Sequence, residues 1–159
     1  MAEDFSRITG TKKEQYRALL PQIVGLISGE ENVIANMANM VAVLKTQFDF
    51  FWVGFYLVDE EKDELVLGPF QGPVACTRIG YGKGVCGSAW ENAKTIIVPN
   101  VDEFPGHIAC SSLSKSEIVI PLVRAGRVWA ILDIDSDELD QFDETDALYL
   151  AEISGLLST

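Results

Sequence analysis

The chain has 159 residues, about the size of one ordinary domain, with 48% hydrophobic and 23% charged residues. Its 24 acidic residues outnumber its 12 basic residues, so the net charge at pH 7 is −12. The composition argues against a disordered protein, and the negative charge argues against nucleic acid and anionic membrane surfaces as partners. We therefore expect a single domain over residues 1–159, with a frayed start at residues 1–10.

Targeting features and cysteine usage both point to the cytoplasm. No apolar run approaches the roughly 20 residues that span a bilayer, and the acidic residues 3–4 do not fit the start of a signal peptide. The 3 cysteines, an odd number without a CxxC pair, disfavour a secreted disulfide scaffold. We expect cytoplasmic thiols that are free at rest or that cycle during a reaction.

The first part of the chain predicts two helices separated by a break at residues 28–29. Thr11 and Glu14 fit a capping box, and the apolar residues after them recur at helical spacing. Pro21 should interrupt or kink this first helix, because proline lacks an amide donor. A second apolar stripe begins at Val33, and its methionines are expected to pack in the core.

The middle of the chain is rich in aromatic and β-branched residues and predicts strands separated by polar turns. The expected elements, in order, are a strand over 51–58, a hairpin partner over 64–67, loop with irregular strand over 68–84, a short helix over 84–92, a short strand over 95–98 and a polar loop over 99–116.

The last part of the chain predicts a hairpin and a final helix. Strands over 117–124 and 127–135 flank a tight-turn dipeptide at 125–126, and Asp143 with Asp146 resembles a helix start. The apolar stripe of that helix is expected to include Leu148, Ala151, Ile153 and Leu156. Because the strands are grouped and the helices lie at both ends, we predict an α+β fold: a central antiparallel sheet with the N- and C-terminal helices packed on one face.

All three cysteines lie in Gly-, Ser- or Pro-rich segments rather than in apolar stripes. Cys86 falls in the first turn of the predicted helix, where free amides and the helix dipole favour a thiolate. Position alone leaves both a redox role and inert packing open for Cys76, Cys86 and Cys110. Zinc is disfavoured because no close C-x₂₋₄-C spacing is present. The single histidine, His107, is expected to be a solvated loop residue rather than a general base for Cys110.

Two aspartates mark the end of the last apolar strand. Asp133 and Asp135, as residues i and i+2, point to the same side, and a regular hairpin places Glu117 opposite residue 134. Three neighbouring carboxylates repel one another, and desolvation raises at least one pKa. Such a cluster suits the binding of an ammonium group, or an acid kept protonated as a hydrogen-bond donor. Ordinary acidic strand ends are the alternative interpretation.

Two aromatic residues share one side of the predicted strand 51–58. Trp52 and Tyr56 are separated on that side only by Gly54, which predicts a hydrophobic wall with an open floor. Packing in the core is the ordinary role of such residues and stays open here.

These motifs together resemble the free methionine-R-sulfoxide reductase family, which consists of small stand-alone GAF domains. The resemblance runs along essentially the whole chain, and its segments are WVGFY at 52–56, LGPFQG at 67–72, AC at 75–76, GKGVCG at 82–87, VPNV at 98–101, HIAC at 107–110, SEIVIP at 116–121 and LDIDS at 132–136.

The resemblance implies a single GAF-type domain with an active-site pocket on the sheet face opposite the helices. It implies a cofactor-free, metal-free thiol reductase that acts on free L-methionine-(R)-sulfoxide through a cysteine sulfenic acid and an intramolecular disulfide. The implied electron donor is thioredoxin or another dithiol, and homodimers are expected.

The family's roles carry over onto matching positions of this chain. Cys110 matches the nucleophile, Cys76 the cysteine that resolves the intermediate as a disulfide, and Cys86 a secondary resolving cysteine. The substrate contacts that the resemblance implies are Trp52, Glu117, Asp133 and Asp135. From the residues themselves we add Tyr56 as a substrate contact and expect Glu117 to be the acid or hydrogen-bond donor.

Two rival functions stay open at this level. One is a non-catalytic GAF sensor that binds a small ligand, and the other is a redox-sensing regulator that uses the same thiols as a switch. Because sensor domains are expected in longer chains beside an output domain, an enzyme is favoured.

Overall fold

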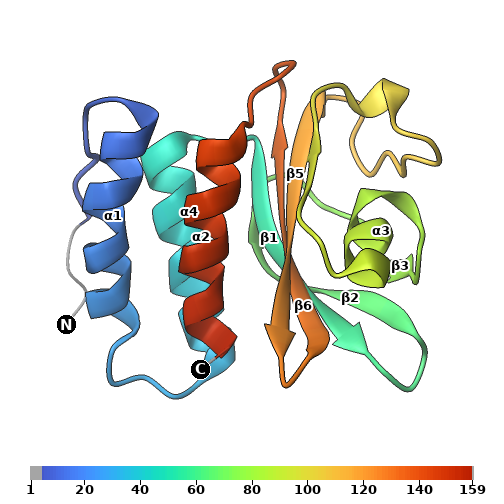
Figure 1. The fold of residues 1–159 in the computed structure, drawn as a ribbon, viewed down its shortest axis with the longest axis horizontal. Helices are drawn as coiled ribbons and strands as arrows, with labels where there is room; N and C mark the ends of the chain where they lie inside the picture. Colours follow the sequence, from blue (N-terminus) through green and yellow to red (C-terminus); the bar gives the residue numbers. More distant parts are fainter. Residues whose placement is uncertain (1–4, 159) are drawn as a thin grey trace.

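An antiparallel sheet forms the centre of the computed structural model, which describes residues 5–158 (Figure 1). In this part of the chain the sheet has 6 strands in the order β3-β2-β1-β6-β5-β4, and every neighbouring pair is antiparallel. Their bounds are β1 Trp52–Asp59, β2 Glu64–Gln71, β3 Arg78–Gly80, β4 Ile96–Val98, β5 Ser116–Arg124 and β6 Arg127–Ser136. The predicted α+β class is confirmed, although β2 runs past its expected end at residue 67.

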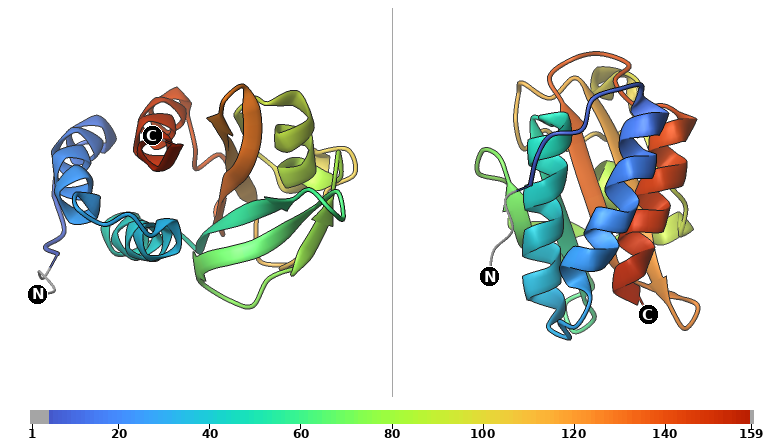
Figure 2. Two further views of the ribbon diagram at one scale, coloured as in Figure 1. Left: turned by 90° about the horizontal axis from the view of Figure 1, so that it is seen from below. Right: turned by 90° about the vertical axis from the view of Figure 1, so that its left-hand side faces the viewer.

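Three helices cover one face of this sheet (Figures 1 and 2). Helix α2 (Val33–Phe48) and helix α4 (Glu144–Gly155) lie against the strands, and α1 (Lys12–Ile27) packs on the outside of both. The short helix α3 (Gly84–Asn92) lies on the other face, and the 3₁₀ turns η1 (Val101–Glu103) and η2 (Leu156–Ser158) complete the elements. The predicted packing of the terminal helices on one face is confirmed.

The helix ends follow the sequence closely, but two details of the helices differ from expectation. The Thr11 side chain accepts a hydrogen bond from the amide of Glu14, and Asp143 with Asp146 forms a complete capping box. Helix α1 continues through Pro21, so the predicted interruption is wrong. Proline removes one amide donor, and buried residues on both sides of it hold the helix against its neighbours.

The last helix buries only part of the expected stripe: the expectation is correct for Ile153 and Leu156 and wrong for Leu148 and Ala151. Leu150 and Ile153 of α4 are fully buried, whereas Leu148 is 58% exposed and Ala151 is also exposed. Several apolar residues crowd this short helix, so its pattern alone does not select one face. Contact with β5 and α1 makes the choice.

Strand alternation gives the sheet one core on each face. Residues Val53, Phe55, Ile118, Ile120, Leu132 and Ile134 pack against the helical layer. Residues Trp52, Tyr56, Val119 and Ile131 pack on the other face, together with α3 and the segments around it. The second core forms the base of the functional site described below.

An irregularity in the β5–β6 hairpin decides which way Glu117 points. Next to the turn the residues pair as in a regular hairpin with a two-residue turn, so Arg124 pairs with Arg127. Beyond Val123 the register shifts by one residue, so that Leu122 pairs with Ala130 and Glu117 with Asp135. The prediction that Glu117 lies opposite residue 134 is therefore wrong. Because paired residues share a face, the regular register would have turned Glu117 toward the helices with Ile134. The bulge brings it to the face of the aspartates.

The start of the chain is tied to α2 where the structure describes it. Residues 1–4 of the expected frayed segment lie outside the described residues. Within residues 5–10, the Ile8 amide donates to Gln47 Oε1 at 2.8 Å, Gln47 Nε2 donates to the Ile8 carbonyl at 2.9 Å, and Arg7 Nε donates to the Gln47 carbonyl at 3.1 Å. Residues 7 and 8 are therefore hydrogen-bonded to α2.

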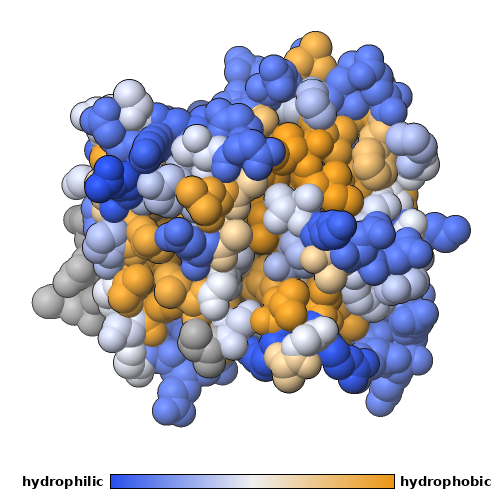
Figure 3. Space-filling model, viewed as in Figure 1, coloured by the Kyte–Doolittle hydropathy of each residue, from blue (hydrophilic) through white to orange (hydrophobic). Residues whose placement is uncertain are grey.

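The surface mixes hydrophilic and hydrophobic residues. On the face seen in Figure 3, hydrophobic residues gather over the helical layer and over the sheet, and hydrophilic residues surround them. None of the helices in the described part of the chain has the length and apolar character to cross a membrane.

Candidate active site

A pocket lies on the sheet face opposite α2 and α4, between α3 and the loops that follow β2 and η1. Its volume is about 40 Å³. The pocket lining includes seven of the residues expected at the site: Trp52, Tyr56, Cys86, Cys110, Glu117, Asp133 and Asp135. The eighth, Cys76, is covalently joined to Cys110.

A disulfide between Cys76 and Cys110 closes one side of this pocket. Its two Cα atoms are 5.5 Å apart, and it joins the β2–β3 loop to the loop between η1 and β5. Cys110 is exposed and Cys76 is half-buried, so the bond lies at the surface. The two cysteines that the resemblance pairs are therefore within bonding reach of each other.

The aromatic residues of β1 hold the loop that carries Cys76. Trp52 Nε1 donates to the Pro73 carbonyl at 3.0 Å, and the Tyr56 hydroxyl donates to the Cys76 carbonyl at 2.8 Å. The two rings stack with centroids 6.0 Å apart, and both side chains are buried. They form the apolar wall that the sequence predicts, and they also fix the position of the loop.

The open floor predicted at Gly54 is wrong. A Cβ atom at this position would lie 2.5 Å from the Trp52 ring and 2.4 Å from Phe70 Cβ. Gly54 thus lets these two aromatic side chains cross over the strand, where they stack at 5.3 Å. The space above the glycine is filled by the wall itself.

The base of the pocket carries the three predicted carboxylates. Glu117 is the second residue of β5 and is paired with Asp135 of β6. Asp133 comes two residues before Asp135 in β6 and therefore lies on the same face of the sheet. Glu117 and Asp133 are buried, with 5% and 6% exposure. Oδ1 of Asp133 is buried without a hydrogen-bond partner among the described residues. Because buried polar atoms normally have hydrogen-bond partners, an oxygen without one indicates a position where a ligand can donate a hydrogen bond.

Burial raises the pKa of all three carboxyl groups. For Glu117 the pKa rises to about 8, because of burial and the nearby charge of Asp135. Burial raises the pKa of Asp133 well above its ordinary value, and the charge of Glu117 adds to this, while the pKa of Asp135 is raised by burial and by Asp133. Glu117 is therefore largely protonated at neutral pH and can donate a hydrogen bond.

Cys86 is a free thiol, and its surroundings differ from the prediction. It lies in the first turn of α3, as expected, but it is 5% exposed and its Sγ donates to Glu117 Oε1 at 3.9 Å. Burial and the charges of Asp133 and Glu117 raise its pKa well above the ordinary value. The expected thiolate is thus disfavoured, because burial and negative neighbours outweigh the helix dipole.

His107 lies against the carboxylates rather than in solvent. Its Nε2 atom is 3.7 Å from Glu117 Oε2, and its side chain is only 14% exposed. The expectation of a solvated loop histidine is therefore wrong. The sequence shows only a lone histidine three residues before Cys110; the contact arises because the loop folds back over β5.

Metal binding fits this donor set poorly. Cys86, Glu117 and Asp133 offer one ligand atom each within 4.8 Å of one another. A metal ion requires deprotonated ligands, whereas burial raises the pKa of all three groups and favours their neutral forms. The cluster suits hydrogen bonding to a polar ligand better than coordination.

Comparison with known proteins agrees with this architecture. The model of the GAF domain family matches residues 31–159. The chain is 64% identical over 157 residues to GAF domain-containing protein A of Dictyostelium discoideum, covering 99% of both chains. It is 43% identical over 143 residues to the free methionine-R-sulfoxide reductase of Escherichia coli, covering 89% of this chain and 86% of that one.

A solved structure extends the likeness to three dimensions. The X-ray structure of the free methionine-R-sulfoxide reductase of Neisseria meningitidis, in complex with its substrate, is 55% identical in sequence and superposes with a TM-score of 0.95. The match covers 98% of this chain and 93% of that one. On these identities and this coverage, the chain belongs to the GAF domain family and, within it, to the free methionine-R-sulfoxide reductases.

Proposed function

We propose that this chain is an oxidoreductase that reduces free L-methionine-(R)-sulfoxide to L-methionine. The observation that carries the proposal is one juxtaposition: a Cys76–Cys110 disulfide lies at the edge of a pocket based on buried carboxyl groups, in a chain whose relatives carry this activity in their names. Catalysis in this proposal uses thiols and carboxyl groups alone, with no bound cofactor.

In the first step Cys110 takes the oxygen of the sulfoxide. A sulfoxide sulfur becomes electrophilic when its oxygen accepts a proton, and Glu117, with its raised pKa of about 8, supplies that proton. The thiolate of Cys110 attacks the sulfur. Transfer of the protonated oxygen leaves Cys110 as a sulfenic acid and releases methionine.

In the second step Cys76 resolves the sulfenic acid. Its thiol attacks the Cys110 sulfur, a disulfide forms, and the hydroxyl leaves as water with the proton of the Cys76 thiol. The bond between the two loops corresponds to the end of this step. Because Cys110 is exposed, an external dithiol can reach the disulfide, and we propose thioredoxin as that donor.

The acidic base of the pocket explains a preference for the free amino acid. A free amino acid carries an ammonium group, which the side chains of Asp133 and Asp135 are placed to accept, and Asp133 Oδ1 has no competing partner among the described residues. A methionine within a peptide has at most one amide N–H there instead of the three N–H donors of the ammonium group, so it makes fewer of these hydrogen bonds. Trp52 and Tyr56 supply the apolar surface for the methyl end of the substrate.

Cys86 keeps a secondary resolving role in this proposal. It lies in the same pocket, but its raised pKa leaves little thiolate to attack a sulfenic acid. We expect the Cys86→Ala variant to keep most of the turnover, whereas Cys76→Ala slows recycling. Mass spectrometry of the two oxidised variants shows which sulfur each one joins to Cys110.

The deciding assay offers the protein three substrates with dithiothreitol: the free (R)-sulfoxide, the free (S)-sulfoxide and N-acetyl-methionine-(R)-sulfoxide. We expect reduction of the first alone, so that methionine forms from the free (R)-sulfoxide but not from the (S)-sulfoxide, and no N-acetyl-methionine forms from the third substrate. A protein that binds the sulfoxide but releases no methionine would instead be a GAF sensor, and one that only forms its disulfide on oxidation would be a redox switch.

Two further expectations complete the proposal. A homodimer, which the family resemblance implies, is checked by the molar mass in light scattering. A cytoplasmic location, expected from the composition and cysteine usage, is checked by cell fractionation.

A further inference from the structure

The single histidine of the chain contacts the catalytic carboxyl group from the solvent side. His107 Nε2 lies 3.7 Å from Glu117 Oε2, while the other oxygen of the same carboxyl group, Oε1, faces Cys86 Sγ at 3.9 Å. We infer that His107 is a proton relay that returns a proton to Glu117 between turnovers. This inference rests on the proposed function, and it assigns a role to a residue that the mechanism above does not use.

Proton balance shows why Glu117 needs such a partner. The Cys110 thiol loses its proton to solvent, its sulfur takes the sulfoxide oxygen, and that oxygen keeps the proton that Glu117 gave. Glu117 is left as a carboxylate, and it must regain one proton before the next sulfoxide can be activated. In the relay, protonated His107 gives this proton to Glu117, and the neutral imidazole then takes one from solvent.

The burial of the two side chains fits a path from solvent inward. The His107 side chain is 14% exposed and that of Glu117 is 6% exposed, so His107 is the more accessible member of the pair. Besides the nucleophile Cys110, the other titratable or charged groups that line the same pocket are Tyr56, Lys83, Cys86, Asp133 and Asp135.

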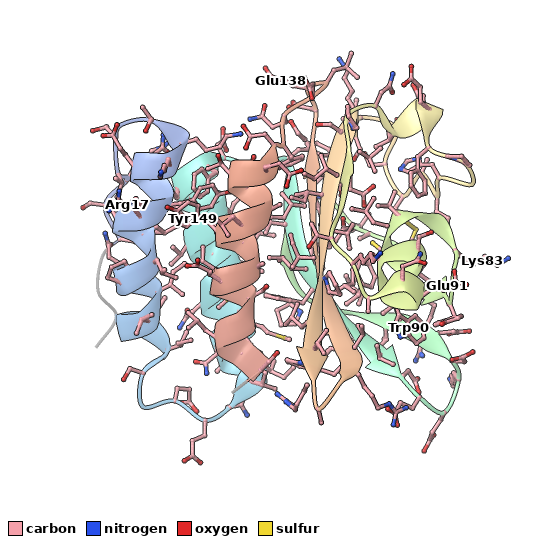
Figure 4. The ribbon with its side chains drawn as sticks, in the orientation of Figure 1. Arg17, Lys83, Trp90, Glu91, Glu138 and Tyr149 are labelled. Atoms are coloured by element: carbon pink, nitrogen blue, oxygen red, sulfur yellow. A yellow bond between two sulfur atoms is a disulfide. The ribbon has the colours of Figure 1, made fainter. Side chains whose placement is uncertain are left out.

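Three of these other groups are poorly suited to carry protons from solvent to Glu117. Lys83 is exposed and extends away from the body of the molecule (Figure 4). Tyr56 and Cys86 hold their protons tightly, because burial raises the pKa of each. Among the described residues that line the pocket, His107 is the one whose ring nitrogen lies beside Glu117 Oε2.

The loop holds His107 in place for this task. The His107 amide donates to the Phe104 carbonyl at 3.2 Å, and Ile108 lies over Gly84 at the start of α3, where an added Cβ would meet Ile108 Cγ1 at 3.1 Å. The separation of 3.7 Å is longer than a hydrogen bond. Contacts between catalytic groups are often long without substrate and shorten when it binds.

A burst experiment separates a relay from a structural role. In His107→Ala the Glu117 carboxyl is already protonated at the start, so the first methionine per chain should form at the wild-type rate. Later turnovers should slow by roughly 10²-fold, the lower end of what positioned proton transfer contributes. Added imidazole should restore the later turnovers by occupying the vacated space. Reduction of the disulfide by dithiothreitol, measured separately, should keep its wild-type rate.

His107→Gln and Leu113→Ala complete the test. Glutamine fills the same space without carrying a proton, so its later turnovers should also be slow, and imidazole should not restore them. Leu113 lies in the same loop, is 61% exposed and does not line the pocket, so its alanine variant should behave as wild type.

Each other outcome overturns the relay. A first turnover slowed as much as the later ones indicates a structural role, and unchanged kinetics in both His107 variants show that no relay is needed. In both cases an active wild type leaves the proposed function standing. A wild-type protein that forms no methionine overturns the proposed function, and the relay falls with it.

Discussion

Both faces of the sheet bury polar side chains, but the two faces differ in how these side chains are hydrogen-bonded. On the helical face, buried Asp146 accepts hydrogen bonds from Tyr16 at 2.6 Å and from Lys12 at 2.7 Å, and Gln47 bonds to residue 8. On the pocket face, Asp133 Oδ1 has no partner among the described residues, and the pKa of each carboxyl group there is raised by burial.

This contrast distinguishes polar groups that support the fold from those kept for a ligand. A buried polar atom without a partner costs about 1–3 kcal/mol, so a fold selected for stability alone would pair it. The helical face does pair its buried groups, and the pocket face keeps carboxyl groups neutral and close together. The difference predicts that substitutions on one face change stability, and that those on the other change turnover.

The largest effect is expected for the nucleophile. Cys110→Ala should abolish methionine formation, because Cys86, the other cysteine in the lining of the pocket, is buried. The measurement is turnover with dithiothreitol, with the same protein's circular dichroism showing that it is folded. Persistent turnover in this variant would move the chemistry away from Cys110.

The next effect concerns the acid. Glu117→Gln keeps the size and neutrality of the side chain but cannot release a proton, so kcat should fall by roughly 10²–10⁴-fold. Its free energy of unfolding at pH 8 should stay at least as high as that of the wild type. An unchanged kcat would remove Glu117 from the mechanism.

The third effect is the pH dependence of stability. Between about pH 4.5, the ordinary pKa of glutamic acid, and about pH 8, the folded chain holds a Glu117 proton that the unfolded chain has released. Rising pH therefore lowers the free energy of unfolding across this window, by up to about 1.4 kcal/mol per unit. Urea titrations at pH 5 and pH 8 measure the loss, which should shrink in Glu117→Gln. A loss equally large in both proteins would assign it elsewhere.

The smallest effect tests the helical face. Asp146→Asn should weaken the contacts to Tyr16 and Lys12 and lower the free energy of unfolding by about 1–3 kcal/mol. Its kcat per folded molecule should equal that of the wild type, because Asp146 lies across the sheet from the pocket. A kcat that fell with stability would erase the distinction between the faces.

Local pattern was enough to predict most of the fold. The helix over 84–92, the hairpin around residues 125–126 and the cap at Asp143 all form as expected, because each depends on neighbours in sequence. The segments that resemble the reductase family could also be recognised in the sequence, and the resemblance predicted the pair of cysteines that form the disulfide.

The incorrect predictions concern features that depend on contacts between segments far apart in the sequence. The β5–β6 bulge lies beside Trp129, whose Nε1 donates to Ser158 Oγ at 2.9 Å and whose ring lies 4.3 Å from the Arg124 guanidinium carbon. A contact with the end of the chain cannot be read from the hairpin's own residues. The burial of Cys86 and His107 likewise arises only when α3 and a distant loop close over the sheet.

The central claim is that Cys110 and the carboxyl cluster act together on one molecule of free sulfoxide. The most direct measurement mixes fully reduced protein with one equivalent of L-methionine-(R)-sulfoxide and no other reductant, then counts methionine and maps the disulfide by mass spectrometry. We predict one methionine per chain and a new bond between Cys76 and Cys110. Methionine formed without that bond, or the bond formed without methionine, would contradict the account.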